Sequence, residues 1–404
     1  MKKPELMAPA GDWTMLKAAI DAGADAVYFG VKQFNMRMKA QNFSLDELSE
    51  IVDLCHKNHV KAYLTLNTII FDDEMEDLEE TIKAAKMACI DMIICWDMAV
   101  MEMAKKYKVP ICLSTQASVS NSKSAKFYKS LGVKRIVLAR ECSLDQIKII
   151  KEAGIEIEVF IHGAMCISIS GRCFLSHESF GKSANRGECQ QPCRAEYLIK
   201  DPDMGGEYIL GKDYVMSPKD LCTIEFIDRL IEAGISSFKI EGRKRSPEYV
   251  STVVSVYREA IDLYFKSKLT EEKKIELLEK LKTVYNRGLS SGFYLGAPSA
   301  QDFATSAGSV ATTNKVYIGK VINYYNKTGV VLFKLESGKL KVNDKIMIQG
   351  PTTGVIEHKI ISMKVNEKVS NTAEKGDFLC IKLDKSVRKT DKVFLIIEKQ
   401  NVLL

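Results

Sequence analysis

Short apolar segments alternate with amphipathic stretches from residue 5 to about residue 265 of this chain. Alternating strands and helices place a parallel sheet at the centre of a fold and helices on its surface. Eight such units are typical of a closed (β/α)8 barrel, so we expect a TIM-like barrel, with an open doubly wound sheet as the alternative. The eight predicted strands are Glu5–Ala8, Ala26–Phe29, Lys61–Leu66, Met92–Cys95, Ile111–Ser114, Arg135–Ala139, Glu156–Ile161 and Ser237–Ile240.

The helical stretches carry recognisable start signals. In the segment 44–57, Leu48, Val52 and Cys55 fall on one apolar stripe. Ser44 precedes Glu47 by three residues, which is the spacing of a capping box, so this helix is predicted to begin there.

At 404 residues the chain is too long for one ordinary core. We expect the barrel over residues 1–268 and a charged helical linker over 269–312. From residue 313 to residue 404 apolar and polar residues alternate between turn signals such as Asn326-Lys327, which is typical of antiparallel strands. A small all-β barrel is predicted for this part.

Composition excludes some classes of protein. Hydrophobic residues make up 46% and charged residues 27%, as in ordinary globular proteins, and no apolar run is long enough for a membrane span. The first residues have no apolar stretch of the kind that follows the charges of a signal peptide, so a cytoplasmic location without membrane contact is expected. A net charge of +6 permits an acidic partner such as RNA.

Four of the eleven cysteines gather in one Gly-rich stretch, namely Cys166, Cys173, Cys189 and Cys193. They belong to a long insertion, residues 163–214, that follows the seventh predicted strand. Four thiolates on a loop suit a structural metal or an iron–sulfur cluster. The spacing lacks the C-x2-C pairs of a zinc ribbon, so we favour a [4Fe-4S] cluster over zinc.

Packing and disulfide bonds account less well for these cysteines. Buried packing fits poorly with polar, Gly-rich neighbours, and disulfides fit poorly with a reducing compartment. A catalytic Cys166 activated by His162 is a further alternative. Cys222 could replace Cys193 as the fourth ligand, although its apolar neighbours favour a core position.

Polar residues follow the predicted strands at the end of the barrel where active sites form. Arg243, after the last strand, could hold a carboxylate or a phosphate with two hydrogen bonds. Together these residues predict a polar rim around the barrel mouth. Its candidate catalytic members are Asn67, Gln116, Arg140, His162, Glu241 and Arg243.

The stretch EVFIHGAMCISISGRCFLS (residues 158–176) resembles the signature of peptidase family U32, the collagenase-like group. ELMAPAGD (5–12), STQAS (114–118) and KIEGR (239–243) resemble other recurring stretches of that family. The resemblance covers roughly residues 1–300. The C-terminal part is similar, more weakly, to the small β-barrel of translation proteins related to elongation factor Tu.

The resemblance implies chemistry other than proteolysis. Several family members are O2-independent hydroxylases that hold a [4Fe-4S] cluster and use prephenate, a small dicarboxylate, as hydroxyl donor. It implies that Cys166, Cys173 and Cys189 are cluster ligands, with Cys193 or Cys222 as the fourth. Arg140 and Arg243 are then the candidates for binding the donor's carboxylates.

The substrate implied for the nearest group is the wobble uridine of tRNA, converted to 5-hydroxyuridine. Ribosomal RNA and a peptide remain alternative substrates, and a paralogous subunit is a possible partner. Histidine is scarce, five in all, and the H-E-x-x-H pattern of zinc peptidases is absent, which favours the hydroxylase over the peptidase. The lysines expected to contact RNA from the C-terminal part are Lys315, Lys327, Lys339 and Lys341.

Overall fold

The computed structural model describes residues 2–195, 197–200, 202–203, 207–210, 216–305 and 308–399. Parts of the predicted insertion, including residues 211–214, therefore lie outside the described residues. All eight predicted barrel strands are present, with ends that differ by at most two residues. They are β1 (Glu5–Pro9), β2 (Ala26–Phe29), β3 (Lys61–Thr65), β4 (Met92–Cys95), β5 (Ile111–Leu113), β6 (Arg135–Val137), β7 (Glu156–Gly163) and β11 (Ser237–Ile240).

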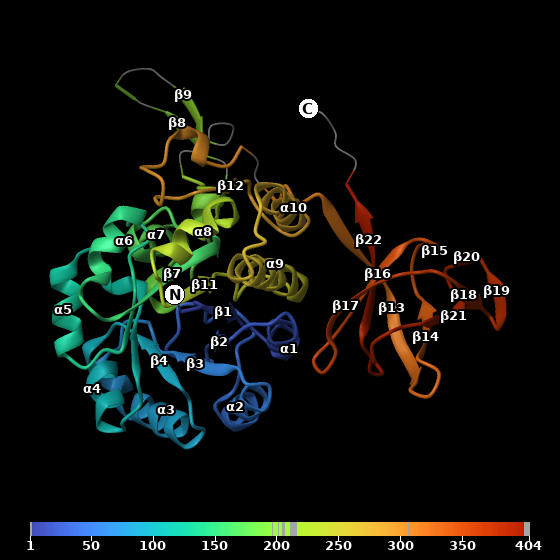
Figure 1. Ribbon diagram of the computed structural model, residues 1–404, viewed down its shortest axis with the longest axis horizontal. Coiled ribbons are helices and arrows are strands. Elements are labelled where there is room, and N and C mark those ends of the chain that lie inside the picture. Colours follow the sequence, from blue (N-terminus) through green and yellow to red (C-terminus); the bar gives the residue numbers. More distant parts are fainter. Residues whose placement is uncertain are drawn as a thin grey trace.

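These strands form a closed parallel barrel. Neighbours pair in the order β1 to β7, and β11 pairs in parallel with both β7 and β1, which joins the two edges. Figure 1 shows the strands as a ring with helices outside it. The predicted TIM-like barrel is confirmed, and the open doubly wound alternative is wrong.

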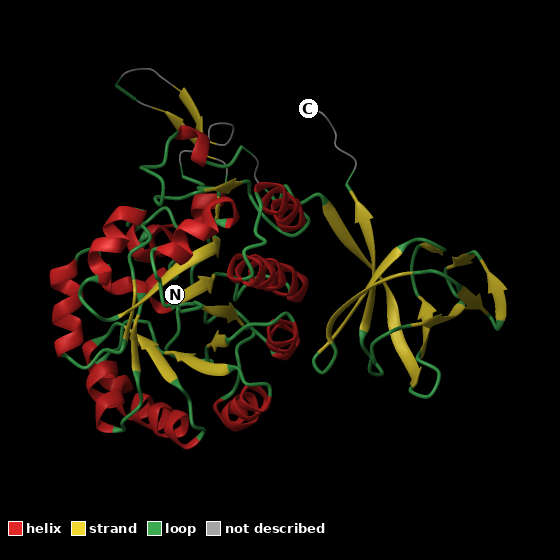
Figure 2. Ribbon diagram, viewed as in Figure 1, coloured by secondary structure: helices red, strands yellow, loops and turns green. Residues whose placement is uncertain are grey.

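Helices surround the barrel, and Figure 2 shows them as an outer layer in red. The predicted capping box is present: the Ser44 backbone N–H donates to the Glu47 carboxylate at 2.7 Å, and a short 3-10 turn precedes the helix itself. The outer helices are α1 (Trp13–Asp21), α2 (Leu48–Lys57), α3 (Met75–Met87), α4 (Met98–Lys106), α5 (Ser122–Ser130), α6 (Leu144–Lys151), α8 (Ile227–Glu232) and α9 (Pro247–Phe265).

The Cys-rich insertion leaves the barrel from the end of β7. It contains α7 (Leu175–Phe180) and the hairpin of β8 (Tyr197–Lys200) and β9 (Glu207–Leu210), and it is followed by β10 (Asp220–Cys222). β10 pairs antiparallel with the last residues of β7, Leu221 opposite Gly163 and Cys222 opposite His162. The insertion therefore adjoins the same strand on both sides, and its loops are held at the barrel mouth.

Gly163 is required at this exit. Its φ is +109°, in the region that favours glycine, and a Cβ here would lie 2.3 Å from the carbonyl oxygen of Glu241. Backbone of β7 and of the segment after β11 can therefore approach closely only because residue 163 has no side chain.

Charged side chains fill part of the barrel interior. Glu158 is fully buried and accepts hydrogen bonds from Lys239 (3.0 Å) and Arg135 (3.3 Å). Arg135 also binds Glu5 at 2.6 Å and the half-exposed Glu156 at 2.9 Å. A buried charge is costly unless it is paired, so each member of this network depends on the others.

The C-terminal part is an antiparallel sheet with its own apolar core. It follows α10 (Glu271–Lys282) and the short β12 (Leu289–Ser290), which pairs with β10. The main sheet runs in the order β17, β16, β22, β13, β14, β21, β18, β19. Its strands are β13 (Thr313–Tyr325), β14 (Val330–Leu335), β16 (Lys345–Gly350), β17 (Gly354–Lys359), β18 (Met363–Val365), β19 (Lys368–Ser370), β21 (Phe378–Lys382) and β22 (Lys392–Glu398).

A two-stranded ribbon, β15 (Lys339–Lys341) with β20 (Thr372–Glu374), completes this part. The predicted all-β unit is confirmed, although the described pairings leave β17 and β19 as unjoined edges. β17 packs against α1, and Lys315 donates to Glu248 of α9 at 2.7 Å, so the sheet is attached to the barrel (Figure 1). Within the described ranges, no helix has the length and apolar character needed to cross a membrane.

We predict that Glu158→Gln destabilises the barrel by about 3–5 kcal/mol, because it leaves Lys239 buried without a counter-charge. The matched control is Glu156→Gln, at the 38% exposed carboxylate on the same arginine, which should cost less than about 1 kcal/mol. Both tryptophans, Trp13 and Trp96, lie in the barrel part, so urea unfolding followed by their fluorescence measures this difference. Equal losses for the two variants would contradict the network.

Candidate active site

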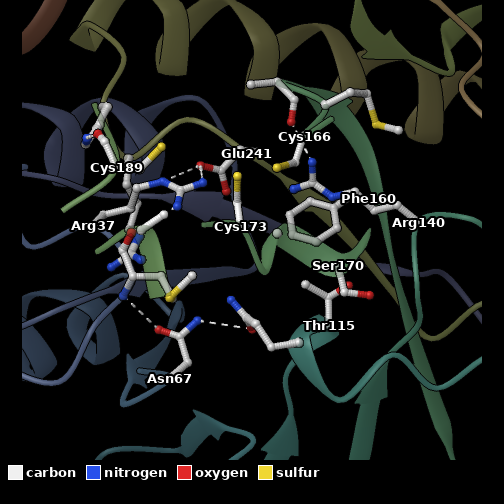
Figure 3. A pocket seen from close by; sticks show the side chains of 18 of the residues that line it. Arg37, Asn67, Thr115, Arg140, Phe160, Cys166, Ser170, Cys173, Cys189 and Glu241 are labelled. Atoms are coloured by element: carbon white, nitrogen blue, oxygen red, sulfur yellow. Dashed lines mark hydrogen bonds and ion pairs between the residues drawn. The ribbon is translucent and has the colours of Figure 1, made fainter. Parts of the chain in front are cut away.

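One cavity lies at the carboxyl ends of the barrel strands and beneath the insertion. All four clustered cysteines line it, together with Asn67, Gln116, Arg140, Glu241 and Arg243 of the predicted rim. Figure 3 shows Cys166, Cys173 and Cys189 around this cavity with Arg37, Arg140 and Glu241. The structure thus brings together residues that lie far apart in the sequence.

The cysteines sit on irregular backbone that presents amide groups to sulfur. The Ser168 N–H donates to Cys166 Sγ, and the Leu175 N–H, at the start of α7, donates to Cys173 Sγ, both at 3.4 Å. Such hydrogen bonds to sulfur are among the contacts that tune iron–sulfur centres.

The four thiols are near enough to influence one another. Burial raises the pKa of Cys193; the positive charge of Arg194 opposes this shift, and the other three thiolates add to it. Arg194 donates to Ser217 Oγ at 2.8 Å and to the Pro218 carbonyl at 2.9 Å. It therefore places a positive charge beside the thiols and ties the insertion to the segment that returns to β10.

The arrangement of the side chains that could bind metal bears on whether the site suits a single ion or a cluster. Among the described residues, no three Cys, His, Asp or Glu side chains converge closely enough to bind a single metal ion. A single zinc ion bound by cysteine needs each sulfur about 2.3 Å from one point. A [4Fe-4S] cluster takes each thiolate on a different iron, so four cysteines around a common cavity fit it better.

Two residues considered from the sequence lie outside the cavity lining. His162 is 1% exposed and its Nδ1 lies 3.3 Å from Tyr257 Oη; burial lowers the pKa of its imidazole to about 4. Cys222 lies opposite it on β10, with Sγ 3.7 Å from the same Tyr257 hydroxyl. Both belong to the packing around β7, so Cys193 shares the cavity with the other three cysteines and Cys222 does not.

The cavity carries an excess of positive charge. Six of its lining residues are cationic and one, Glu241, is acidic; the cationic ones are Arg37, Arg140, Arg194, Lys239, Arg243 and Lys244. Glu241 accepts two hydrogen bonds from Arg37, at 3.0 and 3.2 Å, and Lys239 is paired with Glu158. No ion pair joins Arg140, Arg243 or Lys244 to a carboxylate in the described part of the chain, so these charges are available to an anionic ligand.

Arg243 is held rigidly although it is buried. Its Nη1 donates to Asn35 Oδ1 and Thr65 Oγ1, both at 3.0 Å, while its buried Nε has no partner among the described residues. A Cβ on Gly30 would lie 2.8 Å from this Nη1, so glycine there leaves room for the guanidinium. Burial lowers the pKa of Arg243 to about 10, and the group remains a cation at neutral pH.

Arg140 and Glu241 complete the charged wall. The Arg140 guanidinium stacks over the Phe160 ring, 4.0 Å from its centroid, and donates to the Ala164 carbonyl at 2.5 Å. Burial acts to raise the pKa of Glu241, yet the charges of Arg37, Arg140 and Arg243 lower it to about 2. Glu241 is therefore an ionised group that orients arginines, and it is too weak a base to remove a proton near pH 7.

The amides at the rim are buried parts of the framework. Asn67 Oδ1 accepts from the Met36 N–H at 3.2 Å, and its Nδ2 lies 3.5 Å from Gln116 Oε1. Their exposed fractions are small, so their remaining polar atoms can point only into the cavity or into the protein.

Several lining residues were not predicted, including Arg37, Lys239 and Lys244. Lys239 had a usable signal, because a lysine in the middle of a buried strand requires a partner. Arg37 lies in a long segment after β2, where the sequence shows no feature that distinguishes it from surface basic residues.

The insertion carries exposed apolar side chains. Phe174 is 76% exposed, Ile169 66% and Phe180 57%, all on the insertion. A second hollow opens beside the first and shares Met36 and Gln116 with it. Its other described lining residues are Ile69, Trp96, Arg172, Phe174 and Asn185.

We predict that a thiol reagent at pH 8 labels Cys166 in the folded, metal-free protein well before Cys222. Cys166 is exposed, whereas Cys222 is 3% exposed and burial raises its pKa to about 11. Peptide mass spectrometry after brief iodoacetamide treatment measures both sites. Unfolding should make the two rates similar, and equal labelling in the folded protein would contradict the core position of Cys222.

The chain is similar to known proteins along most of its length. The model of peptidase family U32 matches residues 11–304. A collagenase of Porphyromonas gingivalis is 42% identical, with 96% of this chain and 97% of that protein covered. The tRNA hydroxylation protein P1 of Bacillus subtilis is 40% identical over 89% of this chain and 86% of that protein.

A 23S rRNA 5-hydroxycytidine synthase of Escherichia coli is 40% identical over 64% of this chain and 39% of that protein. The match to the family model includes the barrel strands β2 to β7 and β11, the four cysteines of the cavity and its charged wall, while β1 precedes the matched residues. The chain belongs to peptidase family U32.

Proposed function

We propose that this chain is an RNA-modifying enzyme that hydroxylates the wobble uridine of tRNA at C5, with prephenate as hydroxyl donor. The observation that carries the proposal is one cavity in which four cysteines adjoin arginines without carboxylate partners. Relatives that are 40% identical bear names that describe tRNA hydroxylation and rRNA 5-hydroxycytidine synthesis. Both names describe the hydroxylation of an RNA.

Cys166, Cys173, Cys189 and Cys193 are the residues that would hold a [4Fe-4S] cluster. When bound, such a cluster would supply a centre that accepts and donates single electrons. Arg194, beside Cys193, offsets the negative charge of the thiolates. The insertion shields this part of the cavity from above, while β7 and its partner β10 fix where the insertion begins and ends.

Arg140 and Arg243 are proposed to bind the two carboxylates of the donor. A dicarboxylate needs two cationic groups at fixed separation, and both guanidiniums are held by other contacts. Arg243 also has the unpartnered buried Nε, a donor that is costly to leave unsatisfied. Glu241, ionised and bonded to Arg37, would repel a carboxylate from its side of the cavity and so restrict how the donor lies.

The proposed reaction balances without molecular oxygen. The C5–H bond of the base is replaced by a C–O bond, which oxidises the base by two electrons. The donor loses its hydroxyl, takes up the displaced hydrogen and is reduced by the same two electrons. Because His162 is outside the cavity and Glu241 is a very weak base, no described side chain of the predicted rim is placed to act as a general base.

The exposed aromatic residues at the mouth are suited to an RNA base. A base removed from its stack can lie on aromatic or arginine side chains, as in other RNA-binding sites. Phe174 and Arg172 line the hollow beside the main cavity, and the Arg172 guanidinium lies 6.0 Å from the centroid of the Trp96 ring.

A peptidase is the second candidate, because one of the relatives is named a collagenase. No histidine lines the described cavity, so a Cys166–His162 pair has no support in the geometry. The segment Gly288–Gly292 has the pattern G-x-S-x-G, but Ser290 Oγ accepts from the Gly292 N–H, and no hydrogen bond joins it to a described histidine. These arrangements favour the hydroxylase.

We predict that the anaerobically purified protein is brown with about four irons per chain. Cys166→Ala should remove the colour and the 5-hydroxyuridine from tRNA, while Cys380→Ser, in the C-terminal sheet, should preserve both. Iron analysis of each purified variant measures the cluster content. For the product, each variant is expressed in cells that lack the gene, and mass spectrometry then measures the nucleosides of their tRNA and ribosomal RNA. Loss of a hydroxylated cytidine from ribosomal RNA alone would assign the substrate to ribosomal RNA, and gelatin cleavage by colourless protein would favour the peptidase.

We predict that Arg140→Gln raises the KM for prephenate by about 10- to 100-fold, because a charge-assisted pair of hydrogen bonds is lost. Arg258→Gln is the control: this arginine lies on α9, outside the cavity, and binds Asp25 at 2.8 Å. Steady-state hydroxylation at varied donor concentration measures both. An unchanged KM in Arg140→Gln would remove this arginine from the donor site.

A further inference from the structure

The C-terminal sheet carries the excess positive charge of the chain. Residues 313–404 contain 17 of the 58 Lys and Arg residues and 9 of the 52 Asp and Glu residues, a net charge of +8. The remainder of the chain is therefore at −2, although it holds the proposed active site. Such a division between two parts of one chain points to a polyanionic partner for the sheet.

Three of these lysines form a row across adjacent strands. Lys392 of β22 is directly opposite Lys320 of β13, and Lys320 is directly opposite Lys334 of β14. Residues directly opposite in antiparallel strands point to the same face, so the three ammonium groups share one surface. All three side chains are exposed.

Without a bound anion, the row of lysines destabilises the folded sheet. Like charges directly opposite in a sheet repel each other. No ion pair joins any of the three lysines to a described carboxylate, and Glu336, two residues after Lys334, accepts a hydrogen bond from Tyr317 Oη at 2.8 Å. Three repelling cations without counter-charges are explained most directly by an anion that binds across them.

Aromatic side chains lie on the same face. Phe378 of β21 is directly opposite Lys334, is 46% exposed, and its ring centroid lies 5.6 Å from Lys334 Nζ. Tyr325, 47% exposed, is opposite Val330 of β14, which is opposite Lys382 of β21; this set lies further along the strands, beyond the paired residues Asn323, Leu332 and Cys380. Basic residues interleaved with exposed aromatic rings are the pattern of single-stranded nucleic acid binding.

Two of the four lysines expected from the sequence, Lys315 and Lys339, are already paired with carboxylates. Lys315 binds Glu248 and Gln349 in the attachment to the barrel, and Lys339 binds Glu374 at 2.7 Å. The paired register, which the sequence does not reveal, selects another set.

We infer that the outer face of this sheet binds the backbone of a single-stranded RNA segment, with phosphates on the row Lys320, Lys334, Lys392 and a base on Phe378. This inference rests on the proposed RNA substrate and adds a second RNA contact outside the cavity. Duplex RNA, whose bases are stacked and inaccessible to Phe378, should bind more weakly than a looped RNA.

The test is binding of an unmodified tRNA transcript to the full-length protein at several salt concentrations. Replacing the three row lysines with Gln should weaken binding at least about tenfold and lower the slope of log affinity against log salt by about two. The matched control replaces three exposed lysines on the barrel helices, Lys86, Lys123 and Lys126, with Gln and should bind like the original protein. Arginine at the three row positions should preserve binding, and Phe378→Ala should weaken it about fivefold or more.

Thermal unfolding separates binding from folding. Because the Gln replacements remove repulsion, the melting temperature should stay the same or rise while RNA affinity falls. The inference would be overturned if the row variant bound RNA with unchanged affinity or if the original protein bound no RNA. It would also be overturned if polyglutamate competed as effectively as RNA, a result that would assign the face to an acidic protein. The protein could bind RNA through the three row lysines and yet produce no hydroxylated nucleoside in cells. That result would refute the proposed function but not this inference.

Discussion

The geometry of the site depends on strand β7 and its extension beyond the barrel. Its first part pairs with β6 and β11 and so closes the ring, while its last residues pair with β10 at the end of the insertion. Backbone hydrogen bonds of one strand thus serve the barrel and the insertion together. Because the insertion adjoins this strand on both sides, its cysteine-bearing part lies at the mouth, where the four cysteines share the cavity with the charged wall.

Cationic side chains have different partners deep in the barrel and at its mouth. Deep in the barrel, Arg135 and Lys239 are neutralised by Glu5, Glu156 and Glu158, as burial requires. At the mouth, Arg140 and Arg243 are held by a ring, a carbonyl and neutral oxygens, which fix their positions without cancelling their charge. Arg37 and Glu241 are the exception, and their pairing leaves Arg140 and Arg243 as the arginines proposed for the anionic ligand.

Much of the barrel could be predicted from the sequence, because buried strands and capped helices leave local signals. The eight apolar segments and the capping box at Ser44 are examples, and the clustered cysteines revealed themselves by their density. The position of His162 could not be predicted, because it depends on pairing with β10, which is distant in the chain. The lysine row likewise arises from strand register, a property of three segments that no single segment encodes.

The close approach of backbone around Gly163 and Gly30 limits how the cavity can change. Any larger residue at these places would collide with the Glu241 carbonyl or with Arg243, so neither position can carry a side chain without displacing its neighbours. A change in ligand preference within such a scaffold has to come from substitutions in the walls, where Phe160 and Gln116 line the cavity. A laboratory effort to broaden the range of accepted donors would therefore vary the walls and keep both glycines.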